Sequence, residues 1–106
     1  MTHVLKTWPR YLDAIGRGVK TFEVRRDDRC FRPFDELLLR EWDPDRKDWG
    51  KRWIHCDVTY VLHGGQFGIE PGYVVMGIRL PGNHEWPPED NDTISRPRSN
   101  GGQATE

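Results

Sequence analysis

The sequence predicts a small α+β domain, mainly β, in which about five strands form a barrel and one short helix packs against it. Three observations predict this fold. Apolar and polar side chains alternate with strand period in several segments, glycine and proline punctuate the chain between them, and only the stretch near residue 10 has helical spacing. Five mostly antiparallel strands bury little as a flat sheet, whereas a closed barrel has no free edges and encloses its apolar side chains.

The first elements predicted along the chain are a strand at residues 4–6 and a helix at residues 10–15. Pro9 suits the first turn of this helix, because its missing N–H would have no partner there. Gly16 and Gly18 offer the positive φ that ends a helix. Two turns of helix are not stable alone, so packing against the strands has to hold this one.

Four further strands are predicted at residues 21–25, 36–42, 52–63 and 72–80. The unbroken run of three leucines in the second predicts burial on both faces. In the third, the side chains expected to share one face are Ile54, Cys56, Val58, Tyr60 and Leu62. In the last, those in phase are Val74, Met76, Ile78 and Leu80.

The composition is typical of a soluble protein with one domain. A chain of 106 residues has room for no more. No apolar run approaches the roughly 20 residues of a membrane helix, and no secretory signal is visible. We therefore expect a cytoplasmic monomer without membrane contact. The domain is predicted at residues 1–82 and a disordered tail at 83–106, where Trp86 and Ile94 are the only large apolar side chains. Docking of Trp86 back on the domain is the alternative to a free tail.

Metal or cofactor chemistry is not expected. Cys30 and Cys56 form no C-x-x-C pair, and the four histidines lack the spacing of zinc ligands. Two distant thiols in a cytosolic protein are expected to stay reduced. We therefore predict no metal site and no cofactor.

Residues 18–25 carry the strongest functional signal in the chain. Glu23 and Arg25 are two apart on a predicted strand and share a face, and Lys20 stands where that strand begins. A carboxylate flanked by two cations can grip a polar, anionic ligand. The other reading is an ion pair on a solvated strand face, which contributes only about 0–1 kcal/mol.

The spacing Gly18-x-Lys20-x-x-Glu23-x-Arg25 resembles the G-x-K-x-x-E-x-R signature of ASCH domains in the PUA-like superfamily. Over about residues 2–80 the chain is also similar to the small DUF3850 branch, which is common in bacteriophage and bacterial genomes. Segments that carry this similarity are 3–8, 39–44, 58–62, 64–68 and 72–76. The resemblance implies a mixed β-barrel with a cleft beside the helix, lined by Lys20, Glu23 and Arg25.

RNA or a nucleobase-containing ligand suits these groups. Glu23 can accept hydrogen bonds from a base, while Lys20 and Arg25 meet phosphate or carbonyl oxygens. Thr21 adds a hydroxyl, and Lys6, next to the first strand, a second ammonium. Basic side chains gather at residues 17–32 of a chain with net charge −1. This pattern suits a selective nucleic-acid contact, although it also fits a solvated loop.

Two further segments are candidates for ligand contacts. In the glycine-rich loop 64–68, Gln66 and Phe67 can read and stack on a base as a lid; alternatively, this is a tight turn with Phe67 over the core. Tryptophans interleaved with basic residues flank residues 43–51 and predict either a stacking platform or cross-strand packing. These tryptophans are Trp42, Trp49 and Trp53.

Two alternative functions stay open. Some ASCH relatives are amidohydrolases that act on N4-acetylated cytidine with a lysine, a threonine three residues later and a distant glutamate. Here Lys20 matches the lysine, but Glu23 occupies the threonine position and the nearby threonine is Thr21. An enzyme would therefore use Lys20, Thr21 and Glu23 in an altered arrangement. The other alternative is an accessory protein that binds a protein partner.

Overall fold

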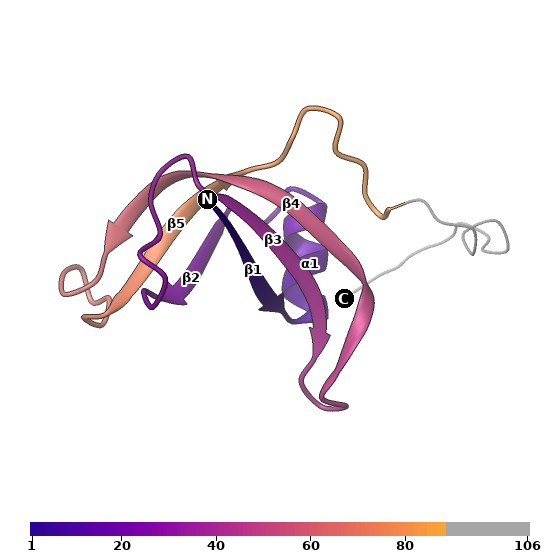
Figure 1. The fold of residues 1–106 in the computed structure, drawn as a ribbon, viewed down its shortest axis with the longest axis horizontal. Coiled ribbons are helices and arrows are strands. Elements are labelled where there is room, and N and C mark those ends of the chain that lie inside the picture. The colour runs from indigo at the N-terminus through magenta and orange to yellow at the C-terminus, as the bar shows by residue number, and fades with distance from the viewer. Residues whose placement is uncertain (89–106) are drawn as a thin grey trace, which may run out of the picture.

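The computed structural model describes residues 1–88, which form one curled five-stranded sheet and one helix (Figure 1). The elements are β1 (Thr2–Thr7), α1 (Pro9–Gly16), β2 (Phe22–Arg26), β3 (Glu36–Asp43), β4 (Asp48–His63) and β5 (Tyr73–Arg79). The strand order is β1-β3-β4-β5-β2. Only the β1–β3 pair is parallel, so the sheet is mixed. The mainly β class, the five strands and the short helix are confirmed.

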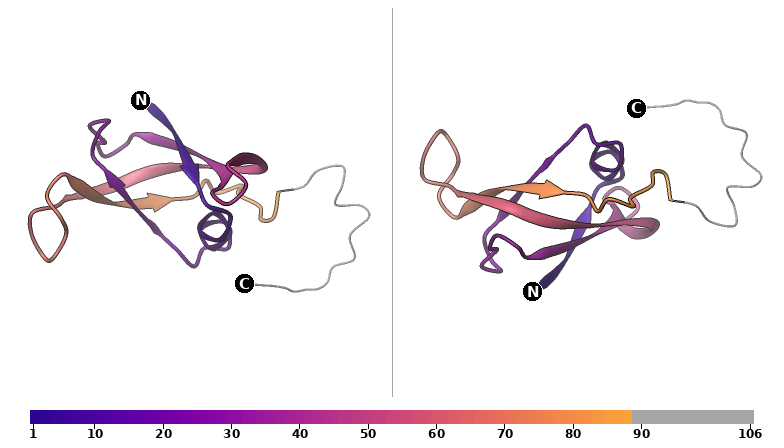
Figure 2. Two further views of the ribbon diagram at one scale, coloured as in Figure 1. Left: turned by 90° about the horizontal axis from the view of Figure 1, so that it is seen from below. Right: turned by 90° about the horizontal axis from the view of Figure 1, so that it is seen from above.

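The sheet is a half-barrel rather than the closed barrel that the sequence predicted. β1 and β2 are its two edges, and no backbone hydrogen bond joins them among the described residues. Figure 2 shows these edge strands as separate ribbons, with α1 seen end-on where the chain passes from one to the other. Guanidinium groups span the gap instead: Arg25 donates to the carbonyl oxygen of Lys6 (2.7 Å) and Arg29 to that of Val4 (2.8 Å). Side chains thus satisfy edge carbonyls that strand pairing would otherwise satisfy.

The core lies between α1 and the concave face of the sheet. The helix contributes Leu12 and Ile15, both fully buried. The strands contribute alternate residues, as their period requires: Leu5, Leu37, Leu39, Ile54, Cys56, Val58, Val74, Met76 and Ile78. Packing of α1 on β3 and β4 explains how a helix of eight residues is held.

Two of the strand predictions are wrong in detail. Leu38 is only half-buried, so β3 has one fully buried face rather than two. Tyr60 is 64% exposed rather than aligned with the core residues of β4. The cause is a register shift between Val58 and Tyr60 in the pairing with β5. The extra residue reverses the face that later side chains of the strand occupy.

A buried polar pair joins β1 to the turn before β3. His3 Nε2 lies 2.9 Å from Oδ2 of Asp35, which also accepts a hydrogen bond from the Arg32 N–H (3.0 Å). Burial raises the pKa of the Asp35 carboxyl. The hydrogen bonds from His3 and Arg32 and the positive N-terminus outweigh that effect, so the pKa lies below its usual value.

The segment after β5 packs against the helix instead of leaving the domain. His84 Nε2 lies 2.9 Å from the carbonyl oxygen of Gly16, and Trp86 Nε1 donates to Asp13 Oδ1 (2.9 Å). The Arg52 guanidinium lies 5.1 Å from the Trp86 ring centroid. The sequence favoured a free tail from residue 83, but these contacts hold Trp86 on α1. Residues 89–106, where most of the predicted tail falls, lie outside the described residues.

Removing the Asp35 charge should destabilise the fold in a pH-dependent way. Because the folded pKa lies below the unfolded value of about 3.9, the carboxylate stabilises the fold above that pH and less as the pH falls further. We expect Asp35→Asn to lower the free energy of unfolding by about 1–3 kcal/mol at pH 7. Urea titrations at pH 7 and below pH 4 measure this. The exposed Asp45→Asn is the control, and a cost that does not shrink at low pH contradicts the assignment.

Gly16→Ala tests whether Trp86 packs on α1 in solution. Alanine is normally better than glycine in a helix by about 1 kcal/mol, but its Cβ here would overlap the Trp86 indole. We expect a net destabilisation of about 1–3 kcal/mol from this overpacking. In a Trp86→Ala background the same substitution should be neutral or stabilising. Equal effects in both backgrounds, measured by urea unfolding, would show that the indole does not lie there.

Candidate ligand-binding site

A cavity of about 420 Å³ opens along the gap between the edge strands, and we call it the seam cavity. The end of β1, the start of α1 with its N-cap Trp8, Lys20 and residues 22–25 of β2 form its walls. Its lining residues are Lys6, Thr7, Trp8, Tyr11, Lys20, Phe22, Glu23, Val24 and Arg25. Its volume lies within the roughly 300–1,000 Å³ of small-molecule sites.

Glu23 points into the half-barrel because of its register on β2. It pairs with Met76 of β5, whose side chain is fully buried, and its own residue is 3% exposed. Phe22 and Val24 therefore lie on the other face and are exposed. The alternation predicted from the sequence is present, but the polar face is the inner one. A carboxylate in this position requires charged partners, because an unpaired buried charge is costly.

Two cations supply those partners. Arg25 Nε donates to Glu23 Oε1 at 2.9 Å, and Lys20 Nζ lies 3.5 Å from Oε2. Lys20 also donates to the carbonyl oxygen of Phe22 at 2.8 Å. Little of the three charged side chains is exposed: 5% of Glu23, 24% of Arg25 and 19% of Lys20. This cluster is therefore not the solvated surface ion pair that the sequence left open.

The Arg25 guanidinium also joins the two edges of the sheet. Its Nη2 donates to the Lys6 carbonyl oxygen (2.7 Å) and lies 3.3 Å from Thr7 Oγ1, both on β1. Within residues 1–88, no group accepts a hydrogen bond from its Nη1. Since a guanidinium carries five N–H donors, Arg25 has donors left for a ligand after holding Glu23 and β1.

Aromatic rings surround the charged floor of the seam cavity. Trp8 and Tyr11 are stacked, with centroids 5.7 Å apart and planes 22° apart. The Lys20 Nζ atom lies 4.7 Å from the ring centroid of Phe22 and 5.7 Å from that of Tyr11. All three rings are exposed. Sequence reasoning missed this rim, although the i, i+3 spacing of Trp8 and Tyr11 at a helix start indicates a shared face.

Lys6 is a lining residue of the seam cavity, and the β3–β4 hairpin positions its ammonium. Nζ lies 3.9 Å from the ring centroid of Trp42. Trp42 and Trp49 themselves pack edge to face across the hairpin, with centroids 5.0 Å apart. Cross-strand packing of these two tryptophans is confirmed. Trp53 is 57% exposed.

Three predicted site residues do not line the seam cavity. Thr21 is exposed, and its carbonyl oxygen accepts a hydrogen bond from the Ile78 N–H (3.1 Å). Gln66 donates to the His63 carbonyl oxygen (2.9 Å), and Phe67 is 83% exposed rather than over the core. Topology explains the positions of Gln66 and Phe67. The β4–β5 loop that carries them ends at Tyr73, which pairs with Arg26 at the C-terminal end of β2. Figure 1 shows this loop at the left end of the fold, away from α1.

The buried Cys56 thiol does not offer nucleophilic chemistry to this region. Desolvation, with the negative charges of Glu23 and Asp57, raises the pKa of its thiol to about 12. The thiol therefore stays protonated at neutral pH and is not a nucleophile. Among residues 1–88, no group of three metal-ligating side chains could hold a metal ion. No described helix is long and apolar enough to cross a membrane.

These features define a class: a small mainly β domain, curled into a half-barrel, with a charged and aromatic cavity at its open edge. The chain belongs to the DUF3850 family, a domain of unknown function, whose model matches residues 2–78. No sequence among the curated proteins matches the chain significantly. The matched range contains every lining residue of the seam cavity, so the cavity is part of the family domain.

Arg25→Ala should destabilise the fold by leaving Glu23 with only the longer contact to Lys20. Loss of one partner of a buried ion pair costs about 3 kcal/mol. We expect that cost in urea unfolding, and near-neutrality for Arg26→Ala, its exposed neighbour on the same strand. Adding Glu23→Gln should recover part of the loss, because no charge is then left buried. Additive effects of the two substitutions would contradict a direct interaction.

Proposed function

We propose that this protein binds RNA or another nucleobase-containing ligand in the seam cavity. The observation that carries the proposal is a buried carboxylate, held by two cations, beneath a rim of three exposed aromatic rings. A planar base with polar edges complements such a site, because its faces stack on aromatic rings and its edges form hydrogen bonds.

Glu23 supports recognition of the base edge. Each carboxylate oxygen has two acceptor positions, and within residues 1–88 each oxygen meets a single donor, from Arg25 or Lys20. An acceptor position therefore remains on each oxygen for an exocyclic amine or a ring N–H. A site built to pair with a polar group rejects analogues that lack it, so base identity should matter.

The charge of the seam cavity supports an anionic ligand. Its lining contains Lys6, Lys20 and Arg25 against the single acid Glu23. This excess of positive charge in a partly enclosed site attracts phosphate. A nucleotide or an RNA segment uses this excess, whereas a neutral nucleoside uses only the base-reading groups.

Membership of the ASCH branch of the PUA-like superfamily is part of the same proposal, since Lys20, Glu23 and Arg25 of the G-x-K-x-x-E-x-R pattern line the cavity. The amidohydrolase alternative has less support. It requires Thr21 beside the substrate, and Thr21 is not among the lining residues. Release of cytidine from N4-acetylcytidine, abolished by Lys20→Ala, would reinstate it. The protein-partner alternative has no specific observation in its favour.

Trp8→Ala should weaken ligand binding without unfolding the domain. Trp8 is 45% exposed, and loss of one stacked base contact costs about 1–3 kcal/mol. Chemical-shift titrations with the four ribonucleotides and with short RNAs measure this. Phe67→Ala, another exposed aromatic residue, is the matched control outside the cavity.

The cations provide a second test of the same site. Lys20→Ala should weaken nucleotide binding, whereas Arg46→Ala at the hairpin turn should not. Shift changes should map to residues 6–8, 11 and 20–25. Flat titrations for every ligand, or equal losses in the cavity and control variants, would refute the proposal.

A further inference from the structure

We propose that the physiological ligand is a single-stranded polynucleotide and that Lys6 and Arg40 hold the phosphates flanking the base in the seam cavity. This inference rests on the proposed function and extends its site from the cavity onto the β3–β4 hairpin.

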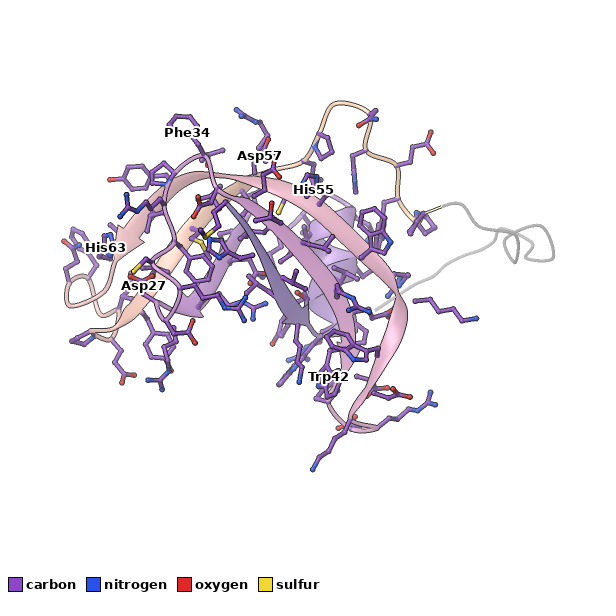
Figure 3. The ribbon with its side chains drawn as sticks, in the orientation of Figure 1. Asp27, Phe34, Trp42, His55, Asp57 and His63 are labelled. Carbon is purple, nitrogen blue, oxygen red and sulfur yellow. The ribbon has the colours of Figure 1, made fainter. Side chains whose placement is uncertain are left out.

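The two cations lie side by side on one face of the sheet. Lys6 of β1 and Arg40 of β3 are register partners, and paired residues of adjacent strands share a face. Lys6 Nζ lies 3.9 Å from the Trp42 ring centroid, and the Arg40 guanidinium lies 4.1 Å from that of Trp49. Figure 3 shows Trp42 at the hairpin end of β3, close to the end of β1.

Neither cation is neutralised by a carboxylate within residues 1–88. In contrast, Arg17 is paired with Asp13 at 3.0 Å and Arg52 with Glu41 at 3.0 Å. An indole ring attracts a cation to its face but carries no net charge. The hairpin tryptophans therefore position Lys6 and Arg40 while leaving both charges for an anion.

Lys6 connects this surface with the seam cavity, because it lines the cavity and contacts the hairpin. Its register partner Arg40 is on the adjacent strand, and neighbouring strands in a sheet lie about 4.8 Å apart. A base in the cavity would leave its own phosphate near Lys6 and the next one near Arg40. Trp49 and Trp53, both exposed, offer rings on which a neighbouring base can stack.

A free nucleoside leaves Lys6, Arg40 and the hairpin tryptophans without a role. An acidic protein segment could meet the two cations but has no planar ring for the aromatic rim. A polynucleotide uses the carboxylate, the rim and the flanking cations together, and it is the occupant to which we commit.

The test compares a nucleoside with pentanucleotides that carry the same base at the centre, as RNA and as DNA. The full chain, Arg40→Gln and Arg79→Gln are titrated at several salt concentrations. Arg40 is exposed and outside the seam cavity, and Arg79 is an exposed arginine on β5, which makes it a charge-matched control. Urea unfolding verifies that both variants are folded.

We expect the pentanucleotide to bind at least tenfold more tightly than the nucleoside. Arg40→Gln should weaken pentanucleotide binding about fivefold and lower the slope of log K against log salt by about 0.7, the value for one phosphate contact on a single strand. Nucleoside binding by Arg40→Gln, and all binding by Arg79→Gln, should be unchanged. A preference between the RNA and DNA arms identifies which polynucleotide the protein binds.

Failure of this inference and failure of the proposed function give different results. If the nucleoside binds and the pentanucleotide binds no more tightly, or Arg40→Gln has no effect, the inference is overturned and the cavity proposal stands. If neither ligand binds, or Trp8→Ala and Lys20→Ala leave both affinities unchanged, the proposed function fails. Competition by polyglutamate that equals competition by RNA overturns the choice of a polynucleotide.

Discussion

The open edge of the half-barrel depends on the Arg25 guanidinium. β1 and β2 share no backbone hydrogen bonds, so their facing polar groups need other partners. Arg25 donates from Nη2 to β1 and from Nε to Glu23 on its own strand. One side chain therefore neutralises a buried acid and joins two sheet edges. The gap that it spans is also the place where the cavity opens.

Fold and candidate binding chemistry share the same residues at this position. The Glu23 carboxylate is tolerated in the interior because two cations meet it, and both cations also line the cavity. A closed barrel would have paired β1 with β2 and left no space for a ligand. The aromatic rim, unlike the charged floor, has no large role in the fold, because its exposed rings contribute little to the core. Substitutions in the rim should therefore change ligand binding with little effect on stability, whereas substitutions in the floor should change both.

The hairpin illustrates a second arrangement of charge. Trp42 and Trp49 pack against each other and hold Lys6 and Arg40 over their faces. Within residues 1–88 the half-buried cations are Lys20, Arg25 and Arg52, and each is paired with an acid that offsets its charge. Cations that rest on indole rings keep their full charge for an external partner. This difference extends the candidate surface beyond the seam cavity.

Local pattern alone determined the five strands, the short helix and the charged cluster at residues 20–25, because period-two alternation and glycine or proline breaks act between near neighbours. Tertiary structure decided which face of β2 points inward, since that depends on its register with Met76. It also decided that Gln66 and Phe67 lie away from the cavity, that Tyr60 faces out, and that Trp86 docks on α1. Each of these outcomes depends on contacts between segments far apart in the chain, and no spacing within a single segment encodes them.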